Sequence, residues 1–242
     1  MEYFWTYETD LPAGTGVEVF GREHLIWVSA AVIFIFVIMA IYGRQTEVIK
    51  RRIQVAISTL LVISYIIQWI WAAATGHFSL VEMLPLHLCT ISAFVEVIAV
   101  ISGNTVLKEF SYCNSLPGAI VAFITPGLKT YPLISYMYLQ FVFVHAVLIL
   151  FPLIWVFKDG YRPNICRLPK CTALLLFFAV IAHWVNSVIG SNYMFINYIP
   201  DDHPLKIIEA WFGNPGYLIP FTGAILIIWV VLYTPWIINE LI

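Results

Sequence analysis

Charged residues are scarce in this chain. Only 11% of its 242 residues are Asp, Glu, Lys or Arg, whereas 61% are hydrophobic. A soluble domain typically carries about a quarter charged residues. Burying more of the chain does not remove that need, because a domain of this size still exposes a large surface to solvent. The composition therefore excludes an ordinary soluble domain and predicts an all-α, polytopic membrane helix bundle.

The chain also lacks a basic patch, a basic start and a metal-binding spacing of cysteines. Without a basic patch, a nucleic-acid partner is not expected. The first 23 residues hold five acidic residues against Arg22 alone, the reverse of a signal peptide, so the first span is expected to stay in place. Cys166 and Cys171, which we place in a short cytoplasmic loop, have no histidine at zinc-ligand spacing. No metal or other cofactor is expected.

What the sequence has instead is a series of long apolar runs, which predict about seven transmembrane helices in one domain over residues 1–242. The fourth run is short and contains Pro117 and Gly118, so it is expected to be kinked or re-entrant. Residues 191–216 are too polar to span and predict an external loop, with a short helix near 205–212. The predicted spans are 25–42, 53–74, 84–101, 112–125, 135–157, 170–190 and 217–238.

The distribution of Lys and Arg predicts the orientation. Positive residues accumulate in cytoplasmic loops. If the N-terminus is outside and the C-terminus inside, nine of the Lys and Arg residues lie on the inner side and three on the outer side. Most of the inner ones are in the loops 43–52 and 158–169. The outer three are Arg22, Lys129 and Lys206. We therefore predict an N-out, C-in protein of the cell membrane.

Polar side chains inside the predicted spans are the candidate functional residues, because an ionisable group in a bilayer is costly and often functional. All of them except Glu96 fall in the outer half or near the middle of the predicted topology. The candidate site is therefore expected to open toward the outer leaflet. The set comprises His87, Cys89 and Glu96 on the third span, Gln68, Asn114, Gln140 and His145 on others, and His183, Asn186, Asn192 and Tyr193 on or just beyond the sixth.

Cys89 and His145 are the pair with catalytic chemistry. If the third and fifth spans meet, His145 can take the thiol proton and the thiolate can attack an acyl carbonyl. The alternative interpretation is structural: Cys89 packs as a small apolar residue and His145 makes an interhelical hydrogen bond. Cys89 is expected in about the second turn of its helix, with Pro85 in the first turn.

The sixth span adds a second group. His183 and Asn186 are three residues apart and are predicted to share a helix face. Asn186 is suited either to orienting an imidazole or to holding helices together. Tyr193 is expected at the external membrane interface.

Three short motifs resemble the YwaF-like family of integral membrane proteins. They are Pro85-Leu86-His87-Leu88-Cys89, the Gln140-to-His145 spacing, and Asn186 with Gly190-Ser191-Asn192-Tyr193-Met194-Phe195. The animal branch of that family includes a transmembrane acyltransferase implicated in making polyunsaturated ether phospholipids, and the androgen-induced membrane lipid hydrolases are distant relatives. The chain departs from the family pattern at Leu133 and Ser135, where members often carry a further His and an Arg.

The resemblance implies an intramembrane lipid acyltransferase or transacylase, with Cys89 as nucleophile, His145 as base and membrane phospholipid as substrate. His87, Gln140, His183, Asn186, Asn192 and Tyr193 would then support or bind the substrate. The alternative is a transporter or a lipid- or small-molecule-binding protein without catalysis. A haem or metal site on His87, His145 and His183 is disfavoured by their spacing.

Overall fold

The computed structural model describes residues 3–128, 130–201, 203 and 205–241, with side chains up to residue 238. This part of the chain is helical throughout, with no strand, which confirms the predicted all-α fold class. Five helices are long and apolar enough to cross a membrane. They are α1 (Arg22–Tyr42), α2 (Glu47–Ala74), α7 (Tyr136–Phe157), α8 (Leu168–Ile189) and α10 (Leu218–Leu241).

Two further rods complete the bundle. One is the shorter helix α4 (Leu88–Ser102). The other runs without a break through α5 (Thr105–Phe110), the π-helix η2 (Ser111–Ser115) and α6 (Leu116–Ile124). Each of the seven predicted spans thus has a helical counterpart. The number that cross the membrane and the N-out orientation stay predictions.

Several predicted boundaries were wrong, because helices continue past the apolar runs that reveal them. α2 starts at Glu47 rather than 53 and includes basic residues that we had assigned to a loop. The fourth rod starts at Thr105 rather than 112, since the Asn104 side chain accepts hydrogen bonds from two amides of its first turn. It is one continuous rod with a π-helical stretch, and whether it crosses the membrane or is re-entrant stays a prediction. Cys171 lies within α8 and is fully buried, not in a loop.

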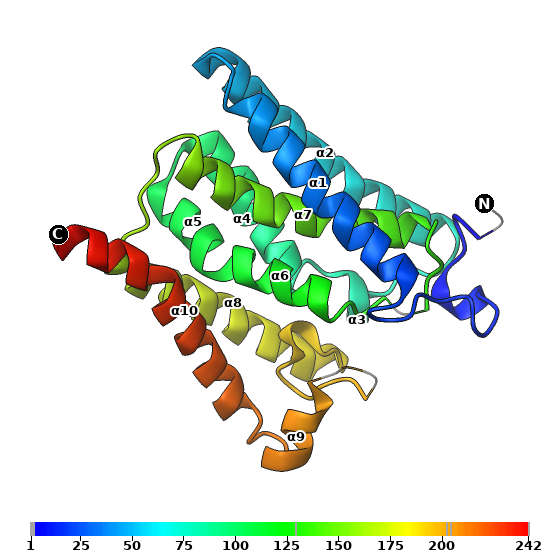
Figure 1. The fold of residues 1–242 in the computed structure, drawn as a ribbon. Helices are drawn as coiled ribbons and strands as arrows, with labels where there is room; N and C mark the ends of the chain where they lie inside the picture. Colours follow the sequence, from blue (N-terminus) through cyan, green and yellow to red (C-terminus); the bar gives the residue numbers. More distant parts are fainter. Residues whose placement is uncertain (1–2, 129, 202, 204, 242) are drawn as a thin grey trace.

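Helix α7 is the centre of the bundle. Two-thirds of its most apolar stretch is buried, against about a tenth of the corresponding stretch of α8 and of α10. It packs against α1, α2, α4 and α6, and these helices lie around it in Figure 1. A continuous apolar core that includes Val147, Leu150 and Phe151 fills the contacts. A group on the buried face of α7 is therefore enclosed by protein on all sides.

The outer helices present large apolar side chains to their surroundings, as a lipid-facing surface requires. Phe36 on α1, Val180 on α8 and Ile227 on α10 are each about two-thirds exposed. The predicted short helix near 205–212 is confirmed as α9 (Lys206–Phe212), which lies next to the N-terminal end of α10 (Figure 1). Positions 202 and 204 of the predicted external loop, and Lys129, lie outside the described residues.

The N-terminal segment, residues 3–21, folds over one end of the bundle. Trp71 at the end of α2 donates its indole N–H to the Trp5 carbonyl at 3.0 Å. The Tyr136 amide at the start of α7 donates to the Phe4 carbonyl at 2.9 Å. The rings of Trp5 and Tyr136 stack with centroids 4.8 Å apart. The segment is thus joined to the two helices whose ends it covers.

Candidate functional site

Cys89 is the second residue of α4, closer to the helix start than its predicted place in the second turn. Residues Leu84–His87 form a turn between the short helix α3 (Leu80–Met83) and α4, and His87 is the N-cap. The imidazole of His87 makes no capping hydrogen bond. The first amides of a helix have no intrahelical acceptor and carry the positive end of the helix dipole. Cys89 therefore lies among uncapped N–H groups.

The immediate surroundings of the thiol are partly polar. The backbone amides of Cys89 and Thr90 are directed at Sγ, and the Thr90 hydroxyl lies 4.0 Å from it. Tyr65 of α2 lies next to both residues, with its hydroxyl beside that of Thr90. Cys89 is half-buried against the central core, and Leu88 packs near Gly118 of α6. The thiol thus lies at the start of α4, next to Tyr65 of α2.

His145 is buried in the middle of α7. Its Nδ1 lies 2.7 Å from the Phe141 carbonyl oxygen, which can only accept, so Nδ1 carries the proton of the neutral ring. Nε2 then has a free lone pair, the form that a general base requires. The rings of Phe141 and Phe123 lie against the imidazole, at centroid distances of 4.3 and 6.0 Å.

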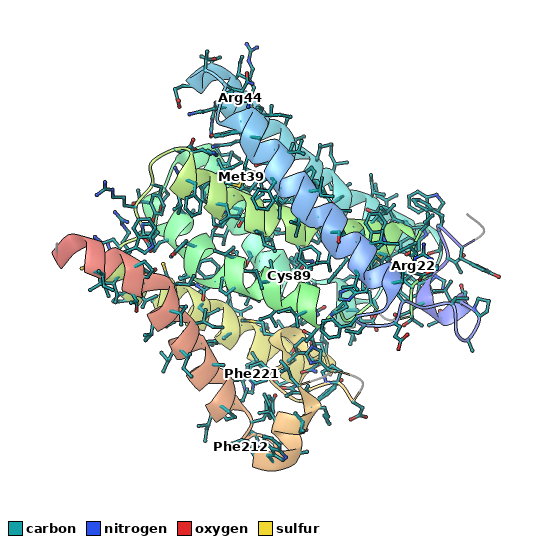
Figure 2. All side chains as sticks on the ribbon, in the orientation of Figure 1. Arg22, Met39, Arg44, Cys89, Phe212 and Phe221 are labelled. Atoms are coloured by element: carbon teal, nitrogen blue, oxygen red, sulfur yellow. The ribbon has the colours of Figure 1, made fainter. Side chains whose placement is uncertain are left out.

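The helices that carry Cys89 and His145 pack against each other. Figure 2 places Cys89 in the middle of the molecule, well away from the labelled Arg44 at the far end of α1. Within the described residues, Sγ makes no hydrogen bond to the imidazole, whose Nδ1 is bonded to Phe141. The predicted direct Cys89–His145 partnership stays a prediction.

Tyr193 connects the loop after α8 to the turn that precedes Cys89. Its hydroxyl donates to the Leu80 carbonyl at 2.6 Å and accepts from the Leu84 amide at 2.9 Å. Its ring also lies edge-on to His87, with centroids 4.9 Å apart. Tyr193 therefore fixes both ends of α3 and the approach to α4, a role that its predicted interfacial position did not include.

Asn186 holds Tyr193 in place. Its side-chain amide donates to the Tyr193 carbonyl at 3.0 Å, and its oxygen accepts from the Tyr193 amide and the Ser191 hydroxyl, both at 2.8 Å. Asn192 organises the same loop through the Tyr198 carbonyl at 2.8 Å. His183 is exposed on α8 while Asn186 is buried, and no hydrogen bond joins their side chains in the described part of the chain. Asn186 positions a tyrosine instead of an imidazole.

Gln140 lies on the buried face of α7 and is paired with α2. Its amide donates to the Gln68 side-chain oxygen at 2.8 Å. An amide pair of this kind satisfies polar groups on two neighbouring helices. No group of three or more His, Cys, Asp or Glu side chains able to hold a metal is present in the described part of the chain.

Sequence reasoning missed a buried acid at the opposite end of the bundle. Glu109 of α5 is fully buried, and it accepts hydrogen bonds from the hydroxyls of Tyr161 and Tyr233, both at 2.5 Å. Arg167 donates to it at 3.1 Å, as does the Asn164 amide. This Glu109 cluster joins α5, the α7–α8 connection and α10. It satisfies the acid completely, as a structural anchor does.

His24 was missed as well. Its Nδ1 accepts from the Phe20 amide at 2.9 Å, so its Nε2 donates to the Phe123 carbonyl, 2.8 Å away. This buried imidazole ties the start of α1 to the end of α6. Its neutral ring is fully used by these two bonds, which indicates a structural role.

Together, these features define a polytopic α-helical membrane protein with a half-buried thiol, that of Cys89, at a helix start whose N-cap side chain makes no capping bond. The model of the TMEM164 family matches residues 19–233, and the chain belongs to that family, a family of membrane proteins. No curated protein and no solved structure matches the chain.

Proposed function

We propose that this protein is an intramembrane acyltransferase or transacylase of the cell membrane that uses Cys89 as nucleophile on the acyl ester of a phospholipid. The observation that carries the proposal is the position of the thiol at the second residue of a helix whose N-cap side chain makes no capping bond. A helix start offers N–H groups and a positive dipole to negative charge. That charge is present on the thiolate and on the oxyanion that follows it.

The proposed reaction has two steps. The Cys89 thiolate attacks the ester carbonyl, and the resulting tetrahedral oxyanion is stabilised by amides at the start of α4. Collapse breaks the ester C–O bond, leaves an acyl thioester on Sγ and releases the lysophospholipid with a proton on its oxygen. An acceptor alcohol then attacks the thioester, gives up its proton, and regenerates the thiol.

His145 is the proposed base. Its Nε2 lone pair is the one ring position that the Phe141 carbonyl leaves open. Because catalytic hydrogen bonds are often long or unformed without substrate, the mechanism requires Nε2 and Sγ to approach when lipid binds. His87 and Tyr193 are proposed to line the substrate path, and Asn186 to hold Tyr193 in place. Gln140, His183 and Asn192 are proposed at most as supporting residues.

Intact mass spectrometry tests the proposal. Purified protein is incubated with phospholipid of one defined acyl chain, and the mass gain of one acyl group is measured before and after hydroxylamine, which cleaves thioesters. The wild type and Cys166→Ala, which removes an exposed thiol, should both gain the adduct. Cys89→Ala should not. Transacylase activity that survives in Cys89→Ala would exclude this mechanism, and solute flux in liposomes that survives in Cys89→Ser would favour the transporter alternative.

A second variant tests the base. His145→Gln should lower the rate of acylation by about 10²–10⁴-fold, the usual contribution of a general base. The loss should shrink as pH is raised, because hydroxide then forms the thiolate without help. A loss that does not depend on pH would assign His145 a packing role.

A further inference from the structure

Glu96 is a fully buried acid that has no hydrogen-bond partner among the residues the structure describes. It lies in the middle of α4, with none of its surface exposed. Neither carboxylate oxygen has a hydrogen-bond partner in the described part of the chain. An unpaired ionised carboxylate in such a place costs at least several kcal/mol. The negative charge of the carboxylate must therefore be neutralised, either by a proton or by a bound cation.

Two serine hydroxyls share this isolation. Ser92 lies one turn before Glu96 on the same face of α4, and Ser115 is the last residue of the π-helix η2. Both are buried, and neither hydroxyl has a partner among the described residues. Buried polar groups without partners are rare in native proteins, and each requires an explanation. Of the six such residues in the described part of the chain, three lie on two adjoining helices, which indicates one shared cause.

The register of the hairpin brings the three residues to neighbouring levels. The chain reverses at Gly103 and Asn104, and α4 packs against η2 and α6. At the other end of the hairpin, a Cβ added to Gly118 would lie 3.7 Å from the Leu88 side chain. Counting back from that contact puts Ser92 level with Ser115. Glu96 is then level with the start of η2, and π-helical turns are frequent at functional sites.

Several titratable side chains on the helices packed against α4 have other partners, whereas the Tyr138 hydroxyl of α7 has none among the described residues. Tyr65 of α2 lies against Thr90, and Glu109 of α5 is held by its own cluster. Cys113 of η2 accepts from the Asn114 amide at 3.2 Å. His145 of α7 is bonded to Phe141. Arg51 of α2 donates to the carbonyls of Val100 and Ile101 at the end of α4. Among the described residues, no basic side chain hydrogen-bonds to Glu96.

We propose that Glu96 is an intramembrane proton-binding site, whose carboxylic acid is kept neutral and exchanges its proton through the hydroxyls of Ser92 and Ser115. A proton is the one cation that needs no coordination sphere, which suits a site enclosed on all sides. A metal cation such as Ca²⁺ would require about six to eight oxygen ligands around it, and a sodium ion likewise needs a shell of oxygens. The stripe Cys89–Ser92–Glu96 follows one face of α4, so the site adjoins the proposed nucleophile. The inference does not depend on the acyl-transfer proposal.

Infrared difference spectroscopy on the full chain in lipid provides the test. The wild type should show the C=O stretch of a protonated, buried carboxylic acid, and Glu96→Gln should lack it. Transfer to D₂O should shift the band, because the proton exchanges. Ser92→Ala should retain the band at a changed frequency. Glu109→Gln is the matched control: it also removes a buried acid, one paired with Arg167, and should leave the band unchanged.

Chemical labelling provides a second readout that does not depend on the spectra. The membrane-soluble reagent dicyclohexylcarbodiimide adds to protonated carboxyls in apolar surroundings, and peptide mass spectrometry should locate its adduct on Glu96. A Glu96-dependent band that appears only after sodium is removed would overturn the proposal in favour of a sodium site. The proposal would also be overturned if folded wild type, compared with folded Glu96→Gln, showed neither the band nor the adduct. Size-exclusion chromatography checks that both proteins are folded. Both results are independent of whether Cys89 forms a thioester.

Discussion

The attachment of α10 to the bundle gives the sharpest prediction about stability. Few residues of α10 are buried, and four hydrogen bonds among the described residues join it to the rod that contains η2. In one of them the Tyr112 hydroxyl donates to the Leu232 carbonyl at 2.9 Å. Trp229 donates to the Cys113 carbonyl at 3.0 Å, and Trp236 to the Tyr112 hydroxyl at 2.9 Å. Between them Tyr233 donates to Glu109 at 2.5 Å. The bond from Tyr233 to Glu109 is the strongest of the four, because its acceptor is a buried charged group paired with Arg167.

Tyr233→Phe removes this one hydroxyl and keeps the ring. A hydrogen bond to a charged group contributes about 1.5–3 kcal/mol, against about 0.5–1.5 for a neutral pair. We expect the lower part of the first range, because Tyr161, Arg167 and the Asn164 amide still hold the acid. A loss of about 1.5–2 kcal/mol corresponds to a ten- to thirty-fold larger unfolding equilibrium constant.

Chemical denaturation in mild detergent measures this loss. Tyr217→Phe is the matched control, because its hydroxyl donates to a neutral backbone carbonyl, that of Phe195, at 2.7 Å. It should destabilise the protein less than Tyr233→Phe. In a double-mutant cycle with Glu109→Gln, the Tyr233→Phe cost should fall, since the charged acceptor is gone. Equal costs for the two tyrosines, or an unchanged cost in the cycle, would refute the reasoning.

Three further predictions concern other parts of the fold. Asn186→Ala removes three hydrogen bonds to the loop that carries Tyr193, so Cys89 should react faster with a maleimide; an unchanged rate would contradict the positioning role. Gly103→Ala should lower the free energy of unfolding by about 1 kcal/mol, because Gly103 ends α4 at a φ of +69°. Gly118→Ala should be tolerated, because its added Cβ would make only an ordinary contact. Thermal unfolding compares the two variants. Burial raises the pKa of Asp159 above its ordinary value, against the hydrogen bond from Tyr42 and the charge of Lys50. The folded state therefore binds that proton more tightly, and the wild type should gain stability relative to Asp159→Asn as pH falls through the acidic range; parallel pH profiles would refute this.

The fold class and the approximate positions of the spans could be predicted from the sequence, because lipid exposure requires long apolar runs. Helix ends were less accessible, since a helix continues into water where hydropathy falls. The start at Thr105 had a visible signal, an asparagine before the rod that is suited to capping it. The Leu84–His87 turn had none, because it depends on Tyr193, more than a hundred residues away.

The partners of the candidate residues could not be predicted from the sequence. Polar side chains in apolar runs identified Cys89, His145, Asn186 and Tyr193. What each contacts is a property of the tertiary structure: the partners of Glu109 lie 52, 58 and 124 residues further along the chain. Glu109 was missed because a charge near the edge of an apolar run is usually solvated.

The cover formed by residues 3–21 has a practical consequence for handling the protein. Proteolysis within it would leave the indole of Trp71 and the amide of Tyr136 without their carbonyl acceptors and would uncover aromatic faces that now stack. Such a trimmed protein would expose aromatic surface and unpaired polar groups at the ends of α2 and α7. Self-association after mild digestion would then report damage to this cover rather than a native oligomer.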